Sequence, residues 1–267
     1  MPNLRQIISL REKYASKERI NDSFNIHEAK KHLEFEELQK AIASEDFKVL
    51  SENISITKYF SVTAKKQIPD IITYFEKQKK EWVVLLYIDI TNFSSKTNEL
   101  SSEDITQRLD NYYNTLIPII YEYEGEIEKI MGDGIICIFG APFLKANNNQ
   151  EKYIKAESCA RKVINTFRTT ENDVKIALHD GQIIYYKTPT DYYKEYTMIG
   201  KVLTELYRLE SVSIPNSINY FQGSTYDKLI SGHSLGITIA NKNWASGHRN
   251  VILNGIGEKQ FKFLTRI

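Results

Sequence analysis

The sequence predicts an α+β protein with a ferredoxin-like βαββαβ core, preceded by an N-terminal helical extension. Three observations lead to this fold class. Residues 82–90 form a continuous run of apolar and β-branched side chains, as expected of a strand covered on both faces. Two further strand-like runs flank Gly132-Asp133-Gly134, which indicates a hairpin. Helical patterns precede and follow that hairpin, and another strand-like run completes the order strand, helix, hairpin, helix, strand.

The first 80 residues differ from the rest because they place apolar side chains at helical spacing among many charges, as at Phe35, Leu38 and Ile42. Pro69 predicts the first turn of a second helix that leads towards the strand at residue 82. We therefore divide the chain into an extension of residues 1–80 and a main domain of residues 81–267. The extension shows no ligand chemistry, and either a packing or dimerisation element or a regulatory sensor fits its pattern.

A helix is expected after the first strand. Ser101 and Asp104, three residues apart, form a capping box at its start. Apolar positions then keep to one face as far as Gly125, with Pro118 as the expected place of a kink. The remaining elements are expected as hairpin strands at 126–131 and 135–140, a helix at 151–167, strands at 174–187 and 196–200, a helix through Leu206 and Leu209, and terminal strands at 251–254 and 260–267.

Composition narrows the classes of function. The 267 residues include 35 Lys+Arg and 34 Asp+Glu, a formal net charge of +1 that gives no basic field for a nucleic acid or an anionic membrane. The apolar run at 82–88 is far shorter than the ~20 residues of a membrane span. Cys137 and Cys159 lie in apolar stretches, which favours buried reduced thiols over a disulfide or a metal site. We expect a cytoplasmic protein that binds neither nucleic acid nor membrane.

Two aspartates are candidates for chemistry. Asp89 ends the apolar strand and Asp133 lies in the hairpin turn, and neighbouring strands could bring these ends together. Paired carboxylates at strand ends suit hard divalent cations such as Mg²⁺, which leave coordination positions for substrate phosphates. Taken singly, an aspartate at such a position is more often a loop residue or a helix cap than a metal ligand.

Five segments occur in the order and spacing of one family, namely YIDITNFS, EIEKIMGDGIICIFGAP, IALHDGQIIYY, YTMIGKVLTELYRLES and VILNGIGE. With these motifs, residues 82–267 resemble the catalytic domain of the class III nucleotidyl cyclases. The resemblance implies that Asp89, the backbone carbonyl of Ile90 and Asp133 hold two Mg²⁺ or Mn²⁺ ions. It also implies in-line attack of a ribose 3′-hydroxyl on the α-phosphorus, which gives a 3′,5′-cyclic nucleotide and pyrophosphate.

The same resemblance assigns substrate contacts. Lys129 matches the base-reading lysine of adenylate cyclases, and Thr197 stands at the place of its partner; together they favour ATP. If the strand stays regular, Lys129, Met131 and Asp133 face one side. Phe93, Tyr87 and Met131 are further substrate-binding candidates; Tyr87 and Met131 are bulky enough to narrow a base pocket for a pyrimidine.

Two positions depart from the family pattern. Arg208 matches the arginine that stabilises charge on the α-phosphate, but Thr204 stands where an asparagine usually orients the ribose. The lysine that often binds the terminal phosphates has no equivalent near residue 255, so Lys259, Lys201 or Lys194 would have to replace it. His179 resembles a frequent family histidine and is expected to be structural.

Family sites are shared between two chains, so the resemblance implies a head-to-tail homodimer with two equivalent sites. Three functions stay open. The first is an ATP cyclase making cyclic AMP; the second is a pyrimidine cyclase making cyclic UMP or cyclic CMP in antiphage signalling of the kind called Pycsar. The third is a catalytically inactive domain that binds only nucleotide.

Overall fold

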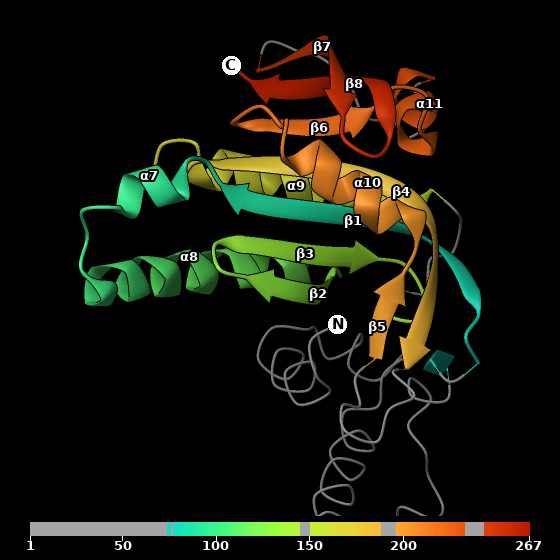
Figure 1. Ribbon diagram of the computed structural model, residues 1–267, viewed down its shortest axis with the longest axis horizontal. Helices are drawn as coiled ribbons and strands as arrows, with labels where there is room; N and C mark the ends of the chain where they lie inside the picture. Colours follow the sequence, from blue (N-terminus) through green and yellow to red (C-terminus); the bar gives the residue numbers. More distant parts are fainter. Residues whose placement is uncertain (1–73, 76, 145–149, 188–195, 233–242) are drawn as a thin grey trace, which may run out of the picture. The chain divides into compact units, whose positions relative to one another are not determined.

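The computed structural model describes residues 74–75, 77–144, 150–187, 196–232 and 243–267 (Figure 1). Almost all of the N-terminal extension lies outside the described residues, as does Lys194. Of the helix expected from Pro69, only Tyr74 and Phe75 are described, and both are helical. The chain forms two compact units. One comprises residues 80–184 and 198–267, and the other residues 2–79 and 185–197. Every candidate site residue that the structure describes belongs to the first unit except Thr197.

The centre of the first unit is an antiparallel four-stranded arrangement in the order β2-β3-β1-β4. This is the strand order of a ferredoxin-like core, so the expected α+β fold class is confirmed. The strands are β1 (Lys80–Ile90), β2 (Glu126–Met131), β3 (Gly134–Phe139) and β4 (Val174–Lys187). All six residues of β3 are buried, as is most of the second half of β1, which explains why neither strand alternates between apolar and polar residues.

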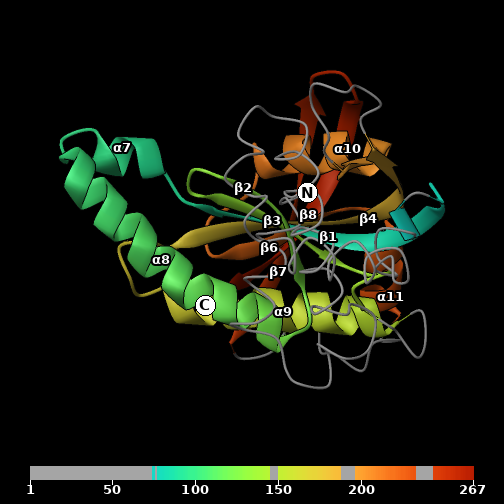
Figure 2. The same cartoon turned by 90° about the horizontal axis from the view of Figure 1, so that it is seen from below.

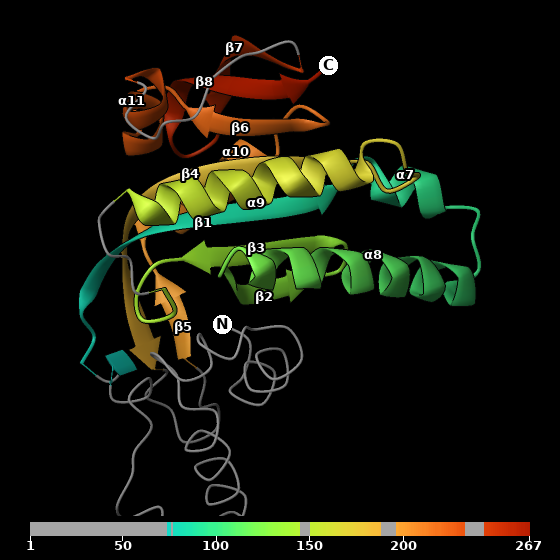
Figure 3. The same ribbon diagram turned by 180° about the vertical axis from the view of Figure 1, so that it is seen from behind.

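Three helices cover the two faces of this sheet (Figures 2 and 3). The helices α8 (Ser102–Glu122) and α9 (Glu151–Phe167) pack against each other on one face, and α10 (Lys201–Glu210) lies on the other. A short helix, α7 (Phe93–Thr97), follows β1. Apolar residues at helical spacing determine which side of a helix packs against the sheet. In α10, the buried side consists of Val202, Leu206 and Leu209.

The capping box expected at Ser101 is present. The Ser101 hydroxyl accepts a hydrogen bond from the Asp104 backbone N–H at 3.1 Å and donates one to its carboxylate at 2.7 Å. Pro118 lies within α8. The helix ends at Glu122, and the left-handed residue that follows is Glu124, with φ 60°, rather than Gly125.

The C-terminal part extends the sheet from β4 through β6 (Ser217–Phe221) and β8 (Gly257–Arg266) to β7 (Trp244–Leu253). The strand β6 pairs parallel with β4, and β8 pairs antiparallel with both β6 and β7. The short strand β5 (Tyr196–Ile199) pairs with β4, and α11 (Thr225–Ser231) follows β6. Neither β6 nor α11 is expected from the sequence, and β7 begins well before the expected residue 251.

Candidate active site

The two candidate metal aspartates meet at one end of the central strands. Ile88 of β1 lies opposite Ile135 of β3, which places Asp89 beside the turn between β2 and β3 that carries Asp133. The two carboxyls lie close enough for Asp133 to raise the pKa of Asp89. Ile90, whose carbonyl is the third expected ligand, is buried at the end of β1 and pairs with Val174 of β4.

Burial and mutual proximity disfavour the charged forms of these two carboxyls. Burial and the neighbouring Asp133 raise the pKa of Asp89 to about 6, although Lys175 opposes the change. Burial also raises the pKa of Asp133. One neighbouring ammonium, that of Lys175, does not balance two half-buried carboxylates, and a hard divalent cation would supply the missing positive charge.

The structure adds two charged residues that the sequence analysis did not single out. Lys175 lies directly across from Asp89 in the β1–β4 register, with its Nζ 3.4 Å from Asp89 Oδ2. The same Nζ lies 2.6 Å from Oε1 of Glu210, the last residue of α10. The only signal in the sequence was a lone lysine in the otherwise apolar start of β4, VKIAL.

Aromatic side chains line the same end of the sheet. The ring of Tyr87 packs edge-on against Tyr207 of α10, with 5.7 Å between centroids. The Tyr207 hydroxyl in turn points at Met131 Sδ, 3.8 Å away. Burial, reinforced by Glu210 and Asp89, raises the pKa of the Tyr87 hydroxyl. Tyr87 and Met131 therefore line a common wall, and Tyr207, which the sequence analysis did not name, joins them.

A glycine makes this close packing feasible. A Cβ atom at Gly134 would lie 2.7 Å from Tyr87 Cε2 and 3.2 Å from Asp89 Oδ1. Its neighbour Gly132 adopts φ 61°, and nothing lies within 4 Å of a Cβ there. Gly132 is thus the residue that the turn conformation requires, whereas Gly134 is required by the approach of Tyr87.

The two expected base-reading residues are placed separately. Lys129 is exposed on β2; the register shift in that strand falls between Ile127 and Lys129, so Lys129 and Met131 keep the alternation expected of them. Thr197 is half-buried on β5 and belongs to the second unit, and its partnership with Lys129 stays a prediction.

The helix α10 carries Thr204 and Arg208 on its exposed side, opposite the buried Val202, Leu206 and Leu209. Among the residues that the structure describes, no ion pair involves Arg208 or Lys129. Both side chains are exposed.

The remaining candidates lie on β4, α10, β8 and α7. His179 Nε2 lies 3.1 Å from Glu205 Oε2 on α10, and Lys201 forms an ion pair with the same carboxylate at 3.3 Å. Lys259 lies on β8. Phe93 begins α7, where the Arg108 guanidinium carbon lies 5.9 Å from its ring centroid.

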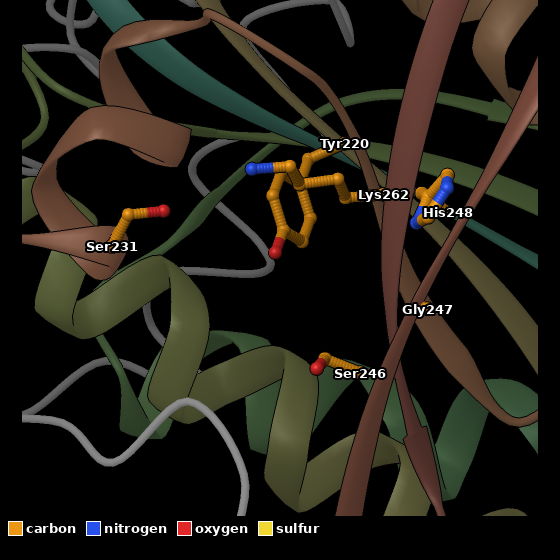
Figure 4. Close-up of a pocket in the computed structure, with 6 residues that line it drawn as sticks. All are labelled: Tyr220, Ser231, Ser246, Gly247, His248 and Lys262. Carbon is orange, nitrogen blue, oxygen red and sulfur yellow. The ribbon is translucent and has the colours of Figure 1, made fainter.

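A cavity of about 240 Å³ lies elsewhere, on the part of the sheet formed by β6, β8 and β7 (Figure 4). It is lined by Tyr220, Ser231, Ser246, Gly247, His248 and Lys262, and none of these is a candidate site residue. The Lys262 ammonium is already paired with Asp227 at 2.9 Å. The cavity therefore adds nothing to the site at Asp89 and Asp133.

The donor set at the strand ends fits hard cations. Within the described part of the chain, no group of three or more His, Cys, Asp or Glu side chains could hold a metal ion. Two carboxylates and a backbone carbonyl are a sparse oxygen set, which suits Mg²⁺ or Mn²⁺ completed by water and substrate phosphates. Both cysteines are buried free thiols, as expected.

The fold and the carboxylate pair define a class of protein, a ferredoxin-like domain with an acidic site at the strand ends. Residues 75–246 match the family described as the adenylate and guanylate cyclase catalytic domain. The chain belongs to this family.

Similar proteins include a curated relative and solved structures of the same fold. The uncharacterized protein Rv1318c of Mycobacterium tuberculosis is 24% identical over 127 residues, which cover 48% of this chain and 23% of Rv1318c. The chain thus matches about a quarter of the length of that relative. Among solved structures, the guanylyl cyclase Cya2 aligns with a TM-score of 0.58 at 19% identity, over 71% of this chain and 94% of Cya2. The adenylyl cyclase CyaB from P. aeruginosa aligns with a TM-score of 0.57 at 20% identity, over 71% of this chain and 96% of CyaB.

The described helices include none that is both long enough and apolar enough to cross a membrane.

Proposed function

We propose that this chain is an active nucleotidyl cyclase that converts a nucleoside triphosphate to a 3′,5′-cyclic mononucleotide and pyrophosphate. The observation that carries the proposal is the meeting of Asp89 and Asp133, two half-buried carboxyls from different elements. In the reaction the ribose 3′-oxygen bonds to the α-phosphorus as the bond to the β-phosphate oxygen breaks. The proton of the hydroxyl is lost to solvent and pyrophosphate leaves.

Different residues of the chain would bind the metal ions, stabilise the developing charge and orient the ribose. Asp89, Asp133 and the Ile90 carbonyl would hold two Mg²⁺ or Mn²⁺ ions, which when bound lower the pKa of the 3′-hydroxyl and neutralise the triphosphate. Arg208 would donate hydrogen bonds to the α-phosphate as negative charge develops there. Thr204 would orient the ribose with a single hydroxyl.

In this proposal, a second copy of the chain completes the active site. The carboxylates lie beside Lys175, whereas Arg208, Thr204 and Lys129 are exposed and ready to face a partner. A head-to-tail homodimer would bring the acidic half of one protomer to the basic half of the other, twice over.

ATP is the substrate that Lys129 and Thr197 favour. A pyrimidine triphosphate is the second candidate, because Tyr207 fills space between Tyr87 and Met131 and would leave less room for a purine. In that case cyclic UMP or cyclic CMP would be the product, and a cytoplasmic antiphage signal of the Pycsar kind the proposed role.

The test is mass spectrometry of products after the purified chain is incubated with ATP, GTP, CTP and UTP together, in Mg²⁺ and separately in Mn²⁺. We expect one cyclic mononucleotide. Asp133→Asn should reduce its formation about a hundredfold or more, because one oxygen ligand loses its charge. Asp110→Asn, which changes an exposed carboxylate on α8, is the matched control and should have no effect. If no nucleotide is cyclised in either metal, the chain is a nucleotide-binding domain and the proposal is wrong.

A further inference from the structure

Lys175 occupies an unusual position for a lysine. Its Cα is paired with that of Asp89 in the β1–β4 ladder, and its ammonium lies between Asp89 and Glu210. The three side chains are only 15 to 20% exposed, so solvent screens their charges poorly.

The local charge is unbalanced. Asp89 interacts electrostatically with both Asp133 and Glu210, and Lys175 contacts Asp89 and Glu210, so three carboxyls share one ammonium. The cluster lacks positive charge even with Lys175 in place.

The two contacts of Lys175 differ in length. The ammonium lies 2.6 Å from Glu210 and 3.4 Å from Asp89. A cation that binds Asp89 would therefore weaken the longer contact, between Lys175 and Asp89. The shorter contact would keep the Lys175 ammonium beside Glu210 of α10.

We propose that Lys175 and Glu210 form a positioning pair that sets the affinity of Asp89 and Asp133 for divalent cations. Lys175 partly neutralises Asp89 in the metal-free protein, and Glu210 draws Lys175 away from Asp89. This inference rests on the proposed metal site at Asp89 and Asp133. It assigns no ligand role to Glu210, consistent with the absence of a three-residue metal group among the described residues.

Opposite effects on metal affinity follow from this arrangement. Lys175→Met removes the competing cation and leaves the carboxylates to repel one another, so a bound cation relieves more repulsion and binds more tightly. Glu210→Gln frees Lys175 to pair with Asp89, so the cation binds less tightly. Partners of metal ligands commonly change affinity by 10–100-fold, and we expect about three- to tenfold in each direction for this indirect effect.

The experiment is a titration of the full chain with Mn²⁺ alone, in which free Mn²⁺ is followed by electron paramagnetic resonance. Thermal unfolding is recorded with and without the metal. Lys175→Met should bind Mn²⁺ more tightly than the wild type and gain more thermal stability from it, and Glu210→Gln should bind less tightly. Lys175→Arg keeps the positive charge and should stay within about twofold of the wild type. Glu210→Gln still tests the proposal if Lys175→Met does not fold.

The controls separate this inference from the proposed function. Lys262→Met breaks another partly buried Lys–Asp pair, on β8, and should leave Mn²⁺ affinity unchanged. If Asp133→Asn abolishes Mn²⁺ binding but the Lys175 and Glu210 variants shift affinity in the same direction or not at all, the positioning pair is wrong and the metal site stands. If the wild type binds no Mn²⁺, or Asp133→Asn binds it equally well, the metal site itself is wrong and both proposals fall.

Discussion

Gly134 leaves room for the side chains of Tyr87 and Asp89 beside the start of β3. A methyl group there would lie 2.7 Å from Tyr87 Cε2 and 2.9 Å from its hydroxyl, so the tyrosine ring would have to shift. Overpacking of this kind typically costs about 1–3 kcal/mol.

We predict that Gly134→Ala lowers the free energy of unfolding by that amount, and that Gly134→Ala/Tyr87→Leu regains most of it because the clashing ring atoms are gone. Urea unfolding of the full chain measures both. Gly132→Ala is the matched control. It should lose about 1–2 kcal/mol through its left-handed backbone alone, and Tyr87→Leu should not restore it. Equal rescue of both glycine variants would contradict the role given to Gly134.

Individual residues show how much of the candidate site can be predicted from the sequence. Asp89 and Asp133 could be identified because their motif places them at a strand end and in a turn. Lys175 and Glu210 could not, because their contact with Asp89 depends on the β1–β4 register and on the packing of α10. Tyr207 could not be identified from the sequence for the same reason, because its neighbour Met131 lies 76 positions away in the chain.

The helix α10 joins structural and proposed catalytic roles in ten residues. Its buried side holds it to the sheet, while Thr204 and Arg208 contribute nothing to that contact. Changes on the exposed side should therefore affect chemistry without affecting folding.

We predict that Arg208→Ala leaves the melting temperature within about 2 °C of the wild type, because exposed substitutions rarely exceed 0.5 kcal/mol. Cyclisation should fall about a hundred- to a thousandfold, as for loss of a donor to a developing charge. Arg168→Ala, at the exposed end of α9, is the control and should change neither quantity. Full activity in Arg208→Ala would refute the role proposed for this arginine.

Elements with strong local signals are found where the sequence predicts them. The helix α9 and the strand β4 have the expected bounds, since each has a long periodic or apolar pattern. The strand β6 escaped detection because it has five residues and is defined by pairing with β4 and β8, which lie far away in the chain. Such pairing leaves no local pattern to recognise.

At the scale of the whole molecule, the proposed dimer can be tested without a structure of the complex. Asp133→Asn and Arg208→Ala would disable opposite halves of a shared site. Mixing the two inactive proteins and letting subunits exchange should produce heterodimers with one intact site. Random exchange puts about half of the chains in heterodimers, so we predict about a quarter of wild-type activity. Mixtures as inactive as their components, with subunit exchange verified by mass, would mean that each chain carries its own complete site.

The ladder between β1 and β4 has a consequence for insertions and deletions. One unbroken register runs from Lys80 opposite Ile184 to Asp89 opposite Lys175. Because strand side chains alternate between faces, adding or deleting one residue near Trp82 would shift the partner of Asp89 from Lys175 to Val174 or Ile176, unless a bulge absorbed the change. Length changes in this ladder should thus be rejected even where the inserted residue is harmless in itself, and homologues should vary in the loops around the ladder rather than within it.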